Sequence, residues 1–208
     1  MNFPNQPSMR YTISFSHNAF IWLPAKTGTN TLSWIIPFFD FASYYFLENK
    51  FVHDEHMNTH FGHEIELPPN HESLLFLCSI RNPYESIFSF FKMAFGRKPG
   101  MFNKEYFAKY MQNEMKISFS KLHKYGAMFT DRVPDYIIRT ENFYSDMVKV
   151  PFIRDSKLNQ CGILEEMCEK KMNKTFDTNS RDFFTDEHIE EINKSYSKIF
   201  EIGGYEKW

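Results

Sequence analysis

The stretch AFIWLPAKTGTNTLSWII, residues 19–36, decides the fold. Its first part, Ala19–Leu23, is a short apolar run rich in aromatic and branched residues, which predicts a buried strand that Pro24 ends. Its last part, Thr29–Ile36, predicts a helix with its apolar residues on one face. A strand, a tight loop and a helix in this order are typical of an α/β domain.

The loop between this strand and this helix, Pro24–Thr31, has the residue types of an anion site. Gly28 allows a close backbone approach, the start of the helix offers N–H groups, and Lys26 adds a positive charge. The order differs from a Walker A loop, in which the lysine follows the second glycine. An ordinary turn with a solvated lysine explains the loop alone equally well.

A second strand and helix repeat the arrangement. The run Leu74–Ile80 is apolar nearly throughout, as in a central parallel strand, and Arg81 follows it directly. Asn82 is the predicted N-cap of this helix and Pro83 its first residue. Glu85 is the predicted capping-box partner, and we expect the helix to continue to about residue 95.

Ser89 lies eight residues after Arg81, about two helical turns along. Ligands of open α/β sheets bind outside the carboxyl ends of the strands, so Arg81 and Ser89 are placed to hold a phosphate group. The alternative is an arginine in a surface salt bridge and a serine on a helix face.

The remaining pattern alternates strands and helices. We expect further strands at 43–47 and 136–139, and further helices at 104–115, 118–124, 141–147, 159–171 and from Thr185 to about 203. Thr185 is the predicted N-cap of the last helix. Residues 51–71 show no clear period and predict an irregular loop. The predicted fold is one α/β domain over residues 1–208, P-loop-like, with a central parallel sheet flanked by helices.

Composition excludes several classes of protein. The chain has 208 residues and a net charge of −2, which argues against nucleic-acid binding through bulk charge. No apolar run approaches the roughly 18 residues of a membrane-spanning helix. The first ten residues are polar and show no signal peptide, and the 3 cysteines form no CxxC pair, so we expect reduced thiols and a cytoplasmic protein.

Together, the two strand–helix units resemble the sulfotransferases that use 3′-phosphoadenosine 5′-phosphosulfate (PAPS). The resemblance lies in the order PxKxGTxT, then RNPYE with a serine eight residues after the arginine. The segment IRTEN at 138–142 and the closing segment from MNKT at 172–175 to Tyr205 are similar to carbohydrate and heparan 2-O-sulfotransferases. The resemblance covers about residues 18–206.

The resemblance implies a role for each matching residue. The 5′-phosphosulfate would be held by Lys26, Thr27, Gly28, Thr29, Asn30 and Thr31. The 3′-phosphate would be held by Arg81 and Ser89, and Lys174 would close over the nucleotide. Asn30 departs from the family, where threonine or serine is commoner, and the loop at Ala25 is one residue longer than in many members.

Sulfuryl transfer to an alcohol needs a base, and an imidazole titrates near working pH, with an ordinary pKa of about 6.5. In carbohydrate 2-O-sulfotransferases the base is a histidine that follows a glycine, and Gly62–His63 matches that pattern. The rivals are His60, Glu55 and Glu64. A zinc site at the histidines of 53–63 is disfavoured because no HExxH motif or nearby cysteine accompanies them, so no metal is expected.

The resulting hypothesis is a PAPS-dependent sulfotransferase whose acceptor is a hydroxyl on a glycan or on another small molecule. His63 would take the acceptor proton while Lys26 stabilises the leaving nucleotide, adenosine 3′,5′-bisphosphate. One alternative is a P-loop nucleotide kinase, for whose Mg²⁺ Asp54 and Asp135 are poor ligands. The other is a nucleotide- or glycan-binding protein without turnover.

Overall fold

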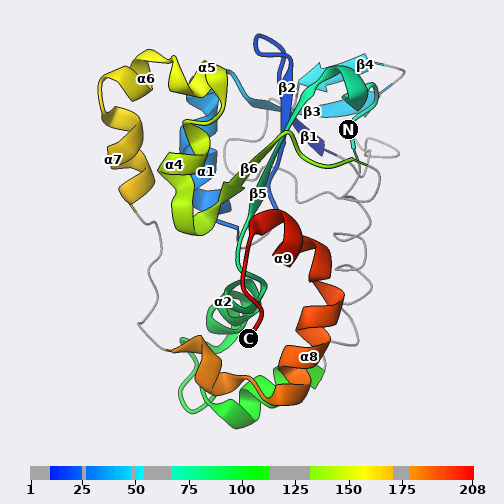
Figure 1. Ribbon diagram of the computed structural model, residues 1–208, viewed down its shortest axis with the longest axis vertical. Helices are drawn as coiled ribbons and strands as arrows, with labels where there is room; N and C mark the ends of the chain where they lie inside the picture. The colour runs from blue at the N-terminus through cyan, green and yellow to red at the C-terminus, as the bar shows by residue number, and fades with distance from the viewer. Residues whose placement is uncertain (1–9, 25–26, 48–49, 54–66, 113–131, 171–178) are drawn as a thin grey trace, which may run out of the picture. The chain divides into compact units, whose positions relative to one another are not determined.

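The computed structural model describes residues 10–24, 27–47, 50–53, 67–112, 132–170 and 179–208 (Figure 1). Contacts divide the chain into two compact units. The first unit comprises residues 1–80 and 134–172, and the second comprises residues 81–133 and 173–208. Each unit has its own hydrophobic cluster. The expectation of one domain over the whole chain stays a prediction.

The first unit contains a β-sheet. Its strands are β1 Arg10–Ser14, β2 Ala19–Trp22, β3 Ala42–Leu47, β4 Lys50–His53, β5 Leu75–Ile80 and β6 Tyr136–Arg139. Within the described residues their order is β4-β3-β1-β2-β5-β6. Strands β2, β5 and β6 are parallel neighbours, whereas β1 pairs antiparallel with β2 and β3, and β3 with β4. The expectation of a parallel sheet is therefore confirmed for three strands and wrong for the sheet as a whole, which is mixed.

Short connections explain the antiparallel half. A turn at residues 15–18, in which Asn18 has a φ of 49°, joins β1 to β2, and only residues 48–49 separate β3 from β4. Connections this short join antiparallel strands, because a parallel crossover needs a dozen residues or more. The sequence analysis missed both β1, RYTIS, in which polar and apolar residues alternate, and β4, KFVH, in which they do not.

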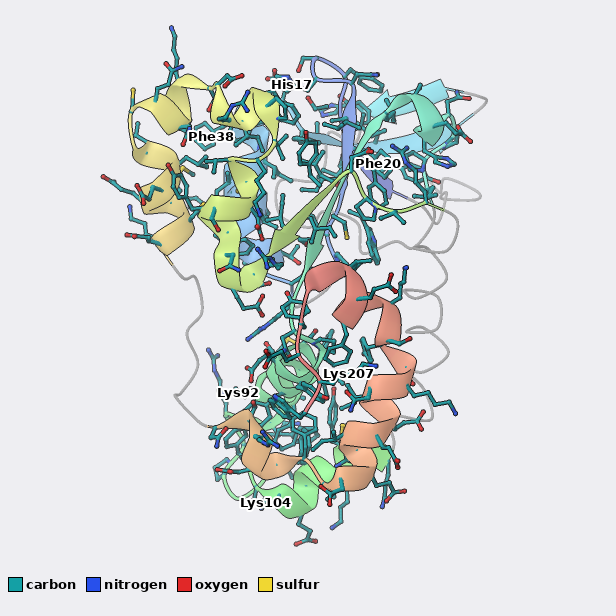
Figure 2. The ribbon with its side chains drawn as sticks, viewed as in Figure 1. His17, Phe20, Phe38, Lys92, Lys104 and Lys207 are labelled. Atoms are coloured by element: carbon teal, nitrogen blue, oxygen red, sulfur yellow. The ribbon has the colours of Figure 1, made fainter. Side chains whose placement is uncertain are left out.

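The strands β2 and β5 are buried on both faces. Ile21 and Leu77 belong to the cluster that α1 covers, at 3% and 0% exposure. On the opposite face Phe20, which Figure 2 labels, stacks on Phe76 with ring centroids 4.5 Å apart. Burial on both faces is the reason why these strands are nearly continuous apolar runs in the sequence.

Helices α1, α4, α5, α6 and α7 gather on one side of strands β2, β5 and β6 (Figure 1). The helices of this unit are α1 Thr29–Ile35, η1 Ile36–Phe39, η2 His71–Ser73, η3 Thr140–Asn142, α4 Phe143–Met147, α5 Pro151–Arg154, α6 Lys157–Gln160 and α7 Ile163–Glu169. The single helix predicted at 159–171 is wrong, because Gly162 takes a left-handed φ of 75° and separates α6 from α7.

The second unit contains α2 Pro83–Phe95, a helix whose described part is 104–112, η4 Ser180–Phe183, α8 Asp186–Ser195 and α9 Ser197–Gly203. Both predicted caps are confirmed: the Asn82 side chain accepts from the N–H of Tyr84 at 3.0 Å, and Thr185 accepts from the N–H of His188 at 3.3 Å. The last helix is interrupted at Tyr196, and the helix predicted at 118–124 lies outside the described residues.

Aromatic side chains form the core of the second unit. Phe88, Phe91 and Phe107 are buried on its helices, and the Trp208 ring stacks on that of Tyr84 with centroids 4.0 Å apart. None of the helices described in either unit combines the length and the apolar character that a membrane crossing requires.

Candidate functional site

The loop between β2 and α1 is shaped by its own hydroxyl groups. The carbonyl of Pro24 accepts hydrogen bonds from the Thr27 hydroxyl at 2.6 Å and from the Thr29 hydroxyl at 3.0 Å. The Thr27 N–H also points to this carbonyl, at 3.3 Å. Both hydroxyl protons are therefore engaged within the loop, which these threonines shape, and their expected part in holding the phosphosulfate stays a prediction. Lys26 and Ala25 lie outside the described residues.

A buried contact between two hydroxyl groups links this loop to β5. The Oγ1 of Thr27 lies 2.6 Å from the Oγ of Ser79, and both side chains are buried. Since Thr27 donates to Pro24, Ser79 is the donor of this second bond. The sequence analysis missed Ser79, although a serine inside an otherwise apolar strand is the signal that marks it.

Replacing Thr27 with valine tests this link. Valine keeps the shape of the side chain but leaves the Ser79 hydroxyl without this buried partner and removes one of the donors to the Pro24 carbonyl, which we expect to lower the free energy of unfolding by about 1–3 kcal/mol. Urea denaturation would measure the loss.

Ser33→Ala is the matched control, because the Ser33 hydroxyl bonds the Asn30 carbonyl at 2.9 Å on the exposed side of α1. An equal loss in the two variants would contradict the role of the buried pair.

Gly28 occupies a position that only glycine suits. Its φ is 78°, and a Cβ atom built there would lie 2.0 Å from Cζ of Phe143, the first residue of α4. The close approach to an anion that is expected at Gly28 stays a prediction, and the group that lies against Gly28 in this structure is the aromatic ring of Phe143. After it, Asn30 is exposed, whereas Thr31 is buried on the core side of α1.

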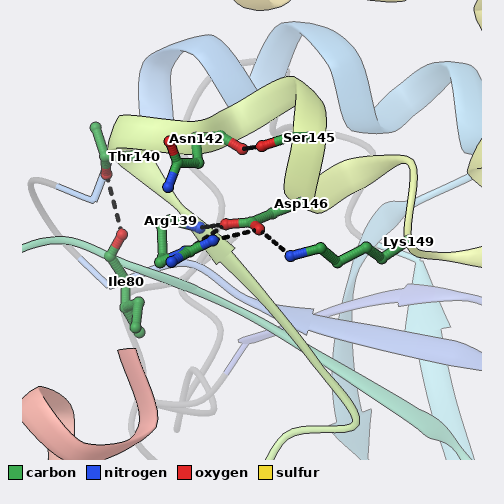
Figure 3. Close-up of polar contacts among 7 residues, drawn as sticks. All are labelled: Ile80, Arg139, Thr140, Asn142, Ser145, Asp146 and Lys149. Atoms are coloured by element: carbon green, nitrogen blue, oxygen red, sulfur yellow. Dashed lines mark hydrogen bonds and ion pairs between the residues drawn. The ribbon is translucent and has the colours of Figure 1, made fainter. Parts of the chain in front are cut away.

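An ion cluster holds α4 against the end of β6 (Figure 3). The carboxylate of Asp146, at 1% exposure, accepts from Nε and Nη2 of Arg139 at 2.7 and 2.8 Å and from Nζ of Lys149 at 2.6 Å. Beside it, the Thr140 hydroxyl donates to the Ile80 carbonyl at 3.1 Å and joins the ends of β6 and β5. The cluster thereby positions Phe143 over Gly28.

Opposing influences act on Asp146. Burial alone raises the pKa of this carboxyl, but the hydrogen bonds from Arg139 and Lys149 outweigh burial and hold the pKa below its ordinary value. The carboxylate is therefore ionised throughout the neutral range. Arg139 lies in the segment that resembles sulfotransferases, whereas the sequence analysis did not single out Asp146.

Arg81 and Ser89 belong to the second unit. The Nη2 atom of Arg81 lies 3.7 Å from an oxygen of Glu85, and the other oxygen of Glu85 accepts a hydrogen bond from Ser180. Ser89 is one turn beyond Glu85 on the same face of α2 and is partly buried. The loop residues belong to the first unit, so the residues expected to bind the two ends of the nucleotide come from different units.

Several expected site residues lie outside the described residues: Lys26, His60, His63 and Lys174. Within the described part of the chain, no group of three or more metal-ligating side chains is placed to hold a metal ion.

The cysteines are free thiols. Cys78 is buried in β5, as expected, and burial raises the pKa of its thiol well above the ordinary value. Burial raises the pKa of Cys168 to about 11. Because the thiolate is the nucleophilic form, neither residue is a nucleophile at neutral pH.

Comparisons of the chain with protein-family models, with curated proteins and with solved structures found no significant match. The resemblance to sulfotransferases therefore depends on this chain's own motifs, and the function is argued from the residues described above.

Proposed function

We propose that this chain is a PAPS-dependent sulfotransferase that transfers a sulfuryl group to a hydroxyl group of a carbohydrate. One observation carries the proposal. Strands β2 and β5 are parallel neighbours, in the register Trp22 to Cys78, so the ends from which both motifs start share one edge of the sheet. The contact between Thr27 and Ser79 joins the two strand ends. This is the edge at which α/β sheets bind their ligands, and it supports a P-loop-like arrangement.

Each proposed role follows from the chemistry of the residue. The acceptor oxygen attacks sulfur in line, the bond from sulfur to the bridging oxygen breaks, and adenosine 3′,5′-bisphosphate leaves. His63 takes the acceptor proton, with His60, Glu55 and Glu64 as the rival bases. Lys26 neutralises the charge that develops on the bridging oxygen, and Arg81 with Ser89 holds the 3′-phosphate. Lys174 closes over the nucleotide.

The described contacts refine the loop's part in this proposal. Thr27 and Thr29 act by shaping the loop around the Pro24 carbonyl, because their protons are already used there. Lys26 and the loop backbone remain as the groups that would hold the phosphosulfate.

A transfer assay tests the proposal directly. Labelled PAPS is incubated with the protein and a panel of glycans and small alcohols, and we expect label to move to an acceptor. Lys26→Ala should abolish most of the transfer, whereas Lys157→Ala, at an exposed lysine of α6, should leave it unchanged. Undiminished transfer by Lys26→Ala would remove Lys26 from the mechanism.

A binding assay separates the proposal from its alternatives. We expect adenosine 3′,5′-bisphosphate to raise the melting temperature and Arg81→Ala to weaken its binding roughly tenfold or more, as for the loss of one charged contact. Binding without transfer to any acceptor would indicate a non-catalytic binding protein.

A nucleotide kinase would instead respond to ATP with Mg²⁺. Asp135 is a poor ligand for that Mg²⁺, because its carboxylate accepts from the Phe76 N–H at 2.7 Å next to the start of β6, at the opposite end of the strand from the loop edge. Asp54 lies outside the described residues.

A further inference from the structure

The pairing of Arg81 is looser than that of the other arginine–carboxylate pairs among the described residues. Its Nη2 lies 3.7 Å from Oε2 of Glu85, beyond the roughly 2.7–3.2 Å of an N–H···O hydrogen bond. In contrast, Arg139 contacts Asp146 at 2.7 and 2.8 Å, and Arg154 contacts Asp155 at 2.8 and 3.1 Å. Arg81 precedes the N-cap Asn82 and Glu85 lies in the first turn of α2, so the two charged groups are near each other without forming the close fork of the other pairs.

Ser180 is the group that restrains Glu85. Its hydroxyl donates to Oε1 of Glu85, the oxygen that does not face Arg81. Ser180 itself is only 4% exposed. It begins η4, which is anchored because the ring of Phe183 packs on Phe88 with centroids 4.9 Å apart. The carboxylate is thus held by the first residue of η4 through the oxygen that does not face the guanidinium.

We infer that Ser180 is a positioning residue of the 3′-phosphate site: by holding Glu85 it keeps that carboxylate from closing on Arg81, and so leaves the guanidinium ready for a phosphate. The inference rests on the proposed function and deepens it. A guanidinium in a forked pair with a carboxylate has to give up that pair before it binds phosphate with the same fork. The Arg81 side chain is 25% exposed, so an anion can reach it.

A double-mutant cycle with adenosine 3′,5′-bisphosphate as the probe tests this inference by calorimetry at low salt. Ser180→Ala frees Glu85 to close on Arg81 and should weaken binding roughly tenfold, about the value of one charge-assisted hydrogen bond. Glu85→Gln removes the competing charge and should leave binding equal or tighter. In the Glu85→Gln background, Ser180→Ala should have no further effect, because no charged competitor remains.

Two controls separate positioning from general structure. Ser195→Ala removes a hydroxyl bonded to Glu191 at 3.2 Å in the same unit, away from the arginine, and should not change binding. Adenosine 5′-monophosphate, which lacks the 3′-phosphate, should bind equally to the wild type and to Ser180→Ala. Equal losses from Ser180→Ala with and without the Glu85 charge would overturn the inference, since they would indicate a merely structural serine.

The outcome of this test is distinguishable from that of the proposed function. If the wild type does not bind the bisphosphate, the proposed function fails. The contact between Arg81 and Glu85 is then measured without nucleotide, from the NMR signal of the Arg81 Nε–H group. Ser180→Ala should shift that signal and slow its exchange with water, and Glu85→Gln should reverse both changes. An unchanged signal in Ser180→Ala would overturn the inference.

Discussion

Gly28→Ala is expected to destabilise the protein by about 2–5 kcal/mol. Two costs add at this position. A residue with a Cβ atom in the left-handed conformation, here with a φ of 78°, loses about 1–2 kcal/mol. The new methyl group would lie 2.0 Å from the Phe143 ring, and overpacking of this kind costs about 1–3 kcal/mol more. Urea denaturation followed by circular dichroism would measure the change.

Gly162 provides the matched control for this prediction. Its φ is 75°, but a Cβ atom there would meet nothing within 4 Å. Gly162→Ala should therefore lose only the conformational part, about 1–2 kcal/mol. In a Phe143→Ala background, the loss of stability caused by Gly28→Ala should fall to that caused by Gly162→Ala. Equal losses at the two glycines in the native background would show that the ring does not limit the loop.

Asp146→Asn is expected to lower the free energy of unfolding by about 3 kcal/mol. The substitution keeps the size of the side chain but removes the charge that Arg139 and Lys149 share at a site with 1% exposure. Removing one partner of a buried pair leaves the other charge uncompensated, which costs about 3–5 kcal/mol in fully buried pairs, and Arg139 is partly exposed. Thermal and urea denaturation at pH 7 would give the value.

The same carboxylate makes stability depend on pH. Because the pKa of Asp146 in the folded protein is below its ordinary value of 3.8, its contribution is complete above that pH and is lost as the pH falls through the folded pKa. The wild type and Asp146→Asn should therefore differ in stability by a constant amount near neutral pH and converge in acid. A difference that grew as the pH fell below 3.8 would contradict the assignment.

Asp155→Asn is the control for both measurements. Asp155 also forms a two-bond pair with an arginine, Arg154, but its side chain is 64% exposed. Exposed ion pairs contribute about 0–1 kcal/mol, so this variant should stay close to the wild type. A loss at Asp155 as large as that at Asp146 would show that burial is not what strengthens the Asp146 cluster.

Local signals in the sequence were sufficient to predict the strands and helices from which the candidate site is built. The apolar runs predicted the ends of β2 and β5 to within about one residue. The predicted bounds of β6 are the same as those in the structure. Asn82 and Thr185 were recognised as caps because capping involves groups within three residues of each other. The sequence analysis did not predict the antiparallel half of the sheet, because it passed over the alternating residues of β1, and the four residues of β4 do not alternate.

The sequence alone determined where the two phosphate-type motifs begin, because apolar runs, caps and a loop glycine act over a few neighbouring residues. Only the tertiary structure decided which side chains those motifs contact. Thr27 and Ser79 are 52 residues apart, and Ser180 and Glu85 are 95 apart. Such partners are chosen by strand pairing and by the packing of η4 on α2, which depend on the whole fold. For the same reason a threonine that the sequence suggests as a phosphate donor is, in the structure, a buried link between a loop and a strand.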